Sequence, residues 1–142
     1  MASQSSEAPG STCLLIIRDA PPETYDALSA EERRESMRRW NAWVDDMVAR
    51  GKVEAGHPLE AAGRVVSGAR GGTVHDGPFT EAKELVGGFF LLTVDSLDEA
   101  TELARACPNL RYGMSIEVRP IAGACHVARS IGWETMRGPA GG

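Results

Sequence analysis

The stretch GGFFLLTVDSLDEATELAR, residues 87–105, decides the fold. Its segment 89–94 is apolar throughout apart from one threonine and has the length of a buried strand. A helix start follows at once, because Ser96 is a typical N-cap residue and Glu99 completes a capping box. The apolar residues of this helix recur on one face, at Leu97, Ala100, Leu103 and Ala104. The stretch therefore predicts a central strand followed directly by an amphipathic helix that ends before Pro108.

A similar pairing of strand and helix opens the domain. Residues 13–17 form another short apolar run, which predicts a second central strand. A capping box at Ser29 and Glu32 begins a helix that Gly51 ends. The predicted buried face of this helix contains Met37, Trp40, Val44, Met47 and Val48. Residues 114–118 alternate apolar and polar side chains, which predicts a last strand with one apolar face.

Two short strands, 64–67 and 73–75, flank a glycine-rich turn between these units. The glycines of 68–72 follow no strand-to-helix junction, so a hairpin tip explains them better than a nucleotide-phosphate loop does. The resulting order of elements is β-α-β-β-β-α-β. With one short hairpin strand set aside, this is the split βαβ order of a ferredoxin-like fold. We therefore predict an α+β protomer with a ferredoxin-like sheet and an inserted hairpin.

The composition predicts one soluble domain without a nucleic-acid or membrane partner. The chain has 142 residues, 42% of them hydrophobic, and a formal net charge of −5, whereas phosphate binding needs a basic surface. No apolar run approaches the length of a membrane helix, and the N-terminus lacks the features of a secretion signal, so we expect a cytoplasmic protein. We divide the chain into a mobile leader at 1–12, a domain at 13–121 and a C-terminal extension at 122–142.

The small number of helices predicts an assembly. Two helices can cover only one face of such a sheet, yet the runs at 13–17 and 89–94 are apolar on both faces. We therefore expect a homodimer packed through the uncovered sheet faces. Four residues of the extension could form a short amphipathic segment that packs on the partner: Val127, Ile131, Trp133 and Met136.

Titratable residues concentrate between the hairpin and the central strand. Asp76, before a Gly-Pro pair, is either a turn residue or a carboxylate that orients or activates a histidine. Because neighbours on a strand point to opposite faces, His75 is a weaker partner for Asp76 than His57, which lies in a connector before the hairpin. A loop-stabilising role for each histidine is the alternative interpretation. No metal-ligand or nucleophile motif occurs, so we expect neither a metal nor a cofactor.

Four segments together resemble one known family. They are DGPFTEAKE at 76–84, GGFF at 87–90, SLDEA at 96–100 and EVRPI at 117–121. The pattern is similar to that of the DGPF or YCII-related family, over about residues 13–121. The resemblance implies a dimeric α+β barrel built from ferredoxin-like protomers.

The resemblance also implies site residues. Some YCII-related members are thought to use a His–Asp pair with the histidine on the first helix, but that helix holds no histidine here. The aspartate carries over to Asp76, and His57 or His75 would have to replace the missing partner. The family pattern is matched at the residues that we expect to bind substrate: Phe79, Glu81, Lys83, Glu84 and Arg119.

Two functions are open at this stage. The first is a cofactor-free enzyme or enzyme-like protein that binds a small organic molecule and transfers protons in an isomerisation, elimination or cyclisation. In it Asp76 and His57, with His75 as second choice, act as base and acid. Arg119 or Lys83 would stabilise a developing oxyanion. The alternative is a non-catalytic dimeric module that binds a ligand or a regulatory protein, with a sigma-factor association as one form.

Overall fold

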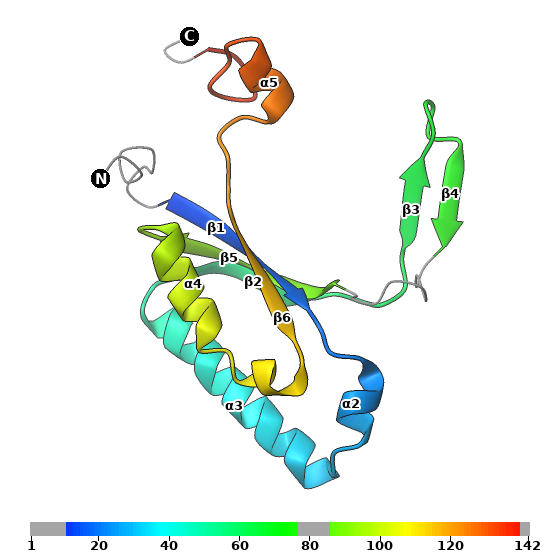
Figure 1. Cartoon of the computed structure of the whole chain (residues 1–142), viewed down its shortest axis with the longest axis vertical. Coiled ribbons are helices and arrows are strands. Elements are labelled where there is room, and N and C mark those ends of the chain that lie inside the picture. Colours follow the sequence, from blue (N-terminus) through cyan, green and yellow to red (C-terminus); the bar gives the residue numbers. More distant parts are fainter. Residues whose placement is uncertain (1–10, 77–85, 140–142) are drawn as a thin grey trace.

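The computed structural model describes residues 11–76 and 86–139, and its centre is a four-stranded antiparallel sheet. The strands are β1 (Ser11–Arg18), β2 (Val53–Pro58), β5 (Val86–Val94) and β6 (Ser115–Pro120), in the order β2-β5-β1-β6. Helices α3 (Ala30–Ala49) and α4 (Leu97–Arg105) lie against one face of the sheet (Figure 1). This is the split βαβ topology of a ferredoxin-like fold, which confirms the predicted architecture.

Shorter elements lie around the sheet and its two helices. Helix α2 (Pro22–Asp26) follows β1, and the 3-10 helix η1 (Pro108–Tyr112) follows α4. A hairpin of β3 (Arg64–Ser67) and β4 (Thr73–Asp76), which we call the arm, forms a separate two-stranded sheet. Helix α5 (His126–Ser130) lies in the C-terminal extension. Figure 1 shows the arm and α5 standing apart from the main sheet.

Strand β2 is the element that the sequence prediction missed. Its residues were expected to form a connector, yet they pair with β5, with His57 opposite Phe89. Neither strand of the arm enters the main sheet, so the fourth strand of the ferredoxin-like order is β2. The segment VEAGHP carries no regular alternation, and its pairing depends on Gly56, where a Cβ would overlap the ring of Phe90. This strand is therefore determined by its partner strand rather than by its own pattern.

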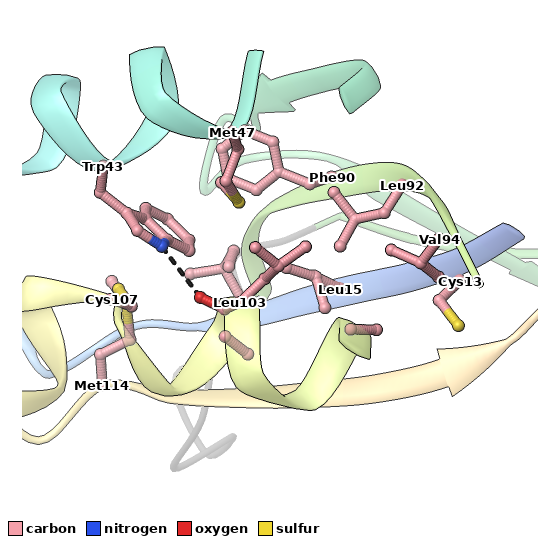
Figure 2. Packing of buried hydrophobic residues seen from close by; sticks show 13 residues of the cluster. Cys13, Leu15, Trp43, Met47, Phe90, Leu92, Val94, Leu103, Cys107 and Met114 are labelled. Carbon is pink, nitrogen blue, oxygen red and sulfur yellow. Dashed lines mark hydrogen bonds between the residues drawn. The ribbon is translucent and has the colours of Figure 1, made fainter. Parts of the chain in front are cut away.

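The core lies between the two helices and the covered face of the sheet (Figure 2). Trp43 Nε1 donates a hydrogen bond to Leu103 O at 2.9 Å, which joins α3 to α4. Alternate residues of β1 and β5 fill the space beneath them: Cys13, Leu15, Ile17, Phe90, Leu92 and Val94. The two predicted central strands are thus confirmed as β1 and β5, since alternate residues of a strand point to the same face.

Both predicted helix starts are confirmed, with one difference of detail. Ser29 Oγ accepts the N–H of Glu32 at 3.1 Å, and Glu32 Oε1 accepts the N–H of Ser29 at 2.8 Å. At α4, Ser96 Oγ accepts the N–H of Glu99 at 3.0 Å. The Glu99 carboxylate, however, accepts the N–H of Asp95, at 2.7 Å, rather than that of Ser96.

Three of the predicted buried positions are wrong. Met37 and Val48 of α3 are 53% and 54% exposed, and Leu97 of α4 is 39% exposed. Helical spacing identifies a broad apolar stripe, whereas the sheet covers only the part of α3 centred on Trp43 and Met47. The apolar side chains at the margins of the stripe therefore remain in contact with solvent.

The face of the sheet away from the helices carries half-buried apolar side chains. Cross-strand pairs of β1 and β5 make this open strip: Leu14 with Leu91, and Ile16 with Phe89. At its margin, Arg18 Nη2 and Glu117 Oε1 form an ion pair at 2.9 Å. The apolar second face that the sequence predicts is therefore present, and the dimer through it stays a prediction.

The arm and the C-terminal extension expose further apolar side chains. On the arm these are Val65, Val66 and Val74, and in the extension they are Val127, Ile131 and Met136. The packing of the extension on a partner chain stays a prediction. No helix in the described ranges has the length and apolar character that crossing a bilayer requires.

Candidate functional site

A pocket of about 450 Å³ lies between α3 and the ends of β1, β2 and β5. Helix α3 contributes Met37, Trp40, Asn41 and Val44 to its wall. The rings of Trp40 and Phe90, with centroids 6.1 Å apart, make its aromatic part. Pockets that bind small molecules are mostly apolar with a few polar groups, and this one has that character.

Glycines make one side of the pocket. A Cβ on Gly88 would lie 2.8 Å from the carbonyl oxygen of His57, and a Cβ on Gly87 would lie 3.3 Å from Asp19 Oδ2. A side chain at Gly88 would therefore displace the backbone of β2, and one at Gly87 would lie tightly against the Asp19 side chain. Gly87 and Gly88 lie on β5, which runs between β1 and β2. Because neither residue has a side chain, this part of the pocket wall is backbone.

Asp19 is the carboxylate among the described residues that line this pocket. It follows the end of β1, and its Oδ1 accepts hydrogen bonds from the Tyr25 hydroxyl at 2.8 Å and from the N–H of Ala20 at 2.8 Å. No donor among the described residues bonds its second oxygen, Oδ2. The side chain is thus held by one oxygen while the other stays available to a ligand.

Tyr25 is itself held in place. Burial and its hydrogen bond to Asp19 raise the pKa of Tyr25 well above its usual range, so the hydroxyl stays a donor. Its ring meets that of Tyr112 edge-on at 5.6 Å. The Tyr112 hydroxyl in turn accepts a hydrogen bond from Arg39 Nη2 at 2.9 Å. This chain of contacts joins α2, η1 and α3 behind the Asp19 carboxylate.

Two asparagines add neutral donors to the pocket. Asn109 of η1 is only 9% exposed, and its Oδ1 accepts a hydrogen bond from the Ser36 hydroxyl at 3.3 Å. That contact uses the amide oxygen, so the N–H groups of the same amide are free to face a ligand. Asn41 of α3 lines the pocket nearer to solvent. Amide donors of this kind can stabilise a developing oxyanion.

His57 borders the pocket from the edge strand β2. Its ring centroid lies 5.9 Å from that of Phe89, its cross-strand partner. Because directly opposite residues share a face, the imidazole lies with Phe89 on the side of the open strip. His57 is therefore a rim residue of the pocket, exposed to solvent.

The other predicted site residues lie elsewhere in the described parts of the chain. Asp76 and His75 are exposed on the arm, where Asp76 Oδ1 pairs with Arg64 Nε at 3.2 Å. Arg119 of β6 is exposed and lies near Glu117, with Nε to Oε2 at 3.8 Å. Neither Asp76, His75 nor Arg119 lines the pocket. The remaining predicted residues fall outside the described ranges: Phe79, Glu81, Lys83 and Glu84.

Sequence reasoning missed Asp19, Tyr25 and Asn109. For Asp19 a signal exists, since it is a carboxylate directly after a buried strand, and connections at the ends of strands often carry functional residues. Tyr25 and Asn109 give no such signal, because their contacts come from packing between elements. Within the described residues, no group of three His, Cys, Asp or Glu side chains is placed to hold a metal ion.

Comparison with known proteins identifies the family. The model of the YCII-related domain matches residues 13–122. The chain belongs to the YCII-related family. This YCII-related protein is 40% identical, over 105 residues, to an uncharacterized protein from Rhizobium meliloti, in a match that covers 68% of the present chain and 81% of the relative.

Among solved structures, this YCII-related protein is similar to 5-chloro-2-hydroxyhydroquinone dehydrochlorinase from Burkholderia phenoliruptrix AC1100 in complex with 2,5-dihydroxybenzoquinone. The TM-score is 0.47 and the sequence identity is 17%. The match covers 80% of the present chain and 95% of the other.

Proposed function

We propose that this YCII-related protein binds a small organic molecule in the α3 pocket and transfers protons on it, with Asp19 as the proton acceptor. One observation carries the proposal: Asp19 is held through Oδ1 by two donors while Oδ2 is left at the edge of an apolar pocket. A positioned carboxylate with a free oxygen is what a general base needs. Under this proposal Asp19 takes the place that the sequence analysis assigned to Asp76.

The pocket supplies the other parts of such a reaction. A ligand ring would pack against Trp40 and Phe90, which orients the reacting atom. The Asn109 amide would donate to an oxygen that gains negative charge. His57, at the rim, would return a proton to the product. Isomerisation, elimination and cyclisation of a small molecule all fit this set of groups without a cofactor.

A homodimer through the open strip is part of the proposal. The strip consists of Leu14, Ile16, Phe89 and Leu91, and ion pairs such as that of Arg18 with Glu117 lie at its margin. An apolar centre with a polar margin is typical of protein interfaces. Two copies related by a two-fold axis would cover the same strip on each other, because such an interface is self-complementary.

The exposed arm supports a second candidate function. A two-stranded hairpin with three exposed valines, Val65, Val66 and Val74, is marginally stable alone in water. A non-catalytic docking module for a ligand or a regulatory protein would use such a surface. Recovery of a stoichiometric protein partner that is lost on changing Val66 to Ser would favour this function over the enzyme.

The test of the enzyme is a matched pair of variants, Asp19→Asn and Asp45→Asn. Asp45 is exposed on α3 and does not line the pocket, so it controls for the loss of one negative charge. Small ring compounds are screened by thermal shift, and binders are incubated with the protein in D₂O to detect proton exchange by NMR. We expect Asp19→Asn to lower the exchange rate by roughly 10²- to 10⁴-fold while Asp45→Asn leaves it unchanged. A folded Asp19→Asn variant with the parent rate would refute the proposal.

His57 is tested in the same way against a second histidine. His57→Gln is compared with His126→Gln, since His126 is exposed on α5, away from the pocket. We expect His57→Gln alone to alter the pH dependence of the exchange, because His57 lies at the rim of the pocket whereas His126 does not line it. Equal pH profiles for both variants would remove His57 from the mechanism.

A further inference from the structure

We infer that the α3 pocket selects its ligand by charge: it takes a neutral or cationic single-ring molecule and disfavours carboxylates and phosphates. This inference rests on the proposed function, because it concerns the same pocket. It goes further in naming the chemical class of the ligand.

The first step is the charge of the lining. Among the described residues that line the pocket, Asp19 is the acidic one, and none is Lys or Arg. An anionic ligand would bring a second negative charge toward Asp19 without a Lys or Arg among the described lining residues to offset it, and like charges repel. A cationic group would meet the same carboxylate as a charge-assisted hydrogen-bond acceptor.

The cations closest in sequence to the pocket residues are already paired. Arg18, the neighbour of Asp19, bonds Glu117 Oε1 at 2.9 Å on the side of the open strip. Arg39, the neighbour of Trp40, donates to the Tyr112 hydroxyl at 2.9 Å and lies 3.4 Å from Glu35. Neither guanidinium lines the pocket. Among the described lining residues, the side-chain donors left to an anionic head group are the Asn41 and Asn109 amides, the Trp40 indole and the His57 imidazole at the rim.

The second step is the free oxygen of Asp19. Oδ1 is occupied by the Tyr25 hydroxyl and the Ala20 N–H, so Oδ2 is the atom that a ligand can reach. Gly87 leaves room there, because a side chain at this position would begin 3.3 Å from Oδ2. A hydroxyl or a protonated amine can donate to Oδ2, whereas an ionised carboxylate has no proton to donate.

The third step is size. A volume of about 450 Å³ lies at the lower end of the range for small-molecule sites, and the interior walls are the apolar side chains of Ile17, Trp40, Val44 and Phe90. One aromatic ring with a short side chain fits this space. The ring would occupy the apolar end, and the donor group would reach Asp19 at the mouth.

Three probes of one shape separate the charge classes. Tyramine, 4-ethylphenol and 4-hydroxyphenylacetate share a para-substituted phenol and a two-carbon side chain, and at neutral pH they are cationic, neutral and anionic. Their dissociation constants are measured by ligand-observed NMR for the native protein, Asp19→Asn and Asp45→Asn. Because Asp19 is exposed to solvent, we expect the anion to bind about two- to fivefold more weakly than 4-ethylphenol, and tyramine at least as tightly as 4-ethylphenol.

The variants decide which group causes the ranking. Asp19→Asn should bring the three dissociation constants together, while Asp45→Asn, which removes the same charge outside the pocket, should keep the native order. Tighter or equal binding of 4-hydroxyphenylacetate by the native protein would overturn the inference and leave the proposed function standing. A native order that persists in Asp19→Asn would overturn it as well. Failure of all three probes to bind folded protein would overturn both the inference and the proposed function.

Discussion

At the scale of single residues, the choice of Asp19 rather than Asp76 as the reactive carboxylate rests on the different surroundings of these two aspartates. Asp19 accepts two hydrogen bonds on one oxygen, and its phenolic donor is packed against a second tyrosine ring. Asp76 instead pairs with Arg64 where both side chains are exposed, Asp76 at 82% and Arg64 at 75% of the side-chain surface. Exposed pairs of this kind contribute little and hold a side chain loosely. Asp19 is therefore the carboxylate with a defined orientation.

Gly88 supports a prediction at the same scale. A Cβ at this position would lie 2.8 Å from the carbonyl oxygen of His57, so the strands β2 and β5 would have to separate. We expect Gly88→Ala to lower the free energy of unfolding by about 1–3 kcal/mol, measured by urea denaturation. Gly72→Ala is the matched control, because a Cβ there meets nothing within 4 Å. Equal stability of the two variants would contradict the close approach of β2 to β5.

At the scale of elements, Glu99 joins three of them. Its Oε2 lies 2.7 Å from Lys52 Nζ, just before β2, and its Oε1 accepts the N–H of Asp95 at the end of β5. The hydrogen bond from Lys52 and then that from Asp95 lower the pKa of Glu99. The carboxylate at the start of α4 thus connects this helix to both strands.

The lowered pKa sets the direction of a pH effect. A carboxyl group with a lower pKa in the folded protein stabilises it above the pKa of the unfolded chain, near 4.3, and this stabilisation is lost as the pH falls through the folded value. We expect Glu99→Gln to cost about 1 kcal/mol at pH 7 and less at about pH 3, by urea denaturation at both pH values.

Glu102→Gln provides the control for this measurement. Glu102 pairs with Arg105 at 3.6 Å, and both side chains are 73% exposed, so its loss should change stability little at either pH. If Glu99→Gln and Glu102→Gln showed the same pH dependence, the contact with Lys52 would have no part in stability.

At the scale of the whole molecule, the helices cover one face of the sheet and leave the open strip on the other. Leu91 lies on that strip opposite Leu14. We expect Leu91→Glu to convert a dimer to a folded monomer, measured by light scattering at micromolar concentration, because a charge at the centre of an apolar interface is desolvated without a partner. Val48→Glu, exposed on the helical side, should leave the mass unchanged. A native protein that is already monomeric would exclude this assembly.

The sequence by itself determined the elements whose signals are local. The capping boxes at Ser29 and Ser96 mark the starts of α3 and α4, and the apolar runs 13–17 and 89–94 mark the two central strands. Capping needs residues only three positions apart, and burial of a strand appears in consecutive side chains. The elements with local signals supply three strands of the ferredoxin-like order, β1, β5 and β6, whereas the fourth strand, β2, has no such signal.

Only the tertiary structure decided what depends on distant contacts. Strand β2 exists because Gly56 admits the ring of Phe90 across the sheet, and the segment itself has no strand pattern. The pocket arises in the same way, since Asp19, which follows β1, and Asn109 of η1 are far apart in the chain and line one pocket only after folding. The family motif made Asp76 a candidate site residue, but the pairing of β3 with β4 places Asp76 on the arm. The physical reason is that strand register and helix docking are set by packing between segments, which no local pattern records.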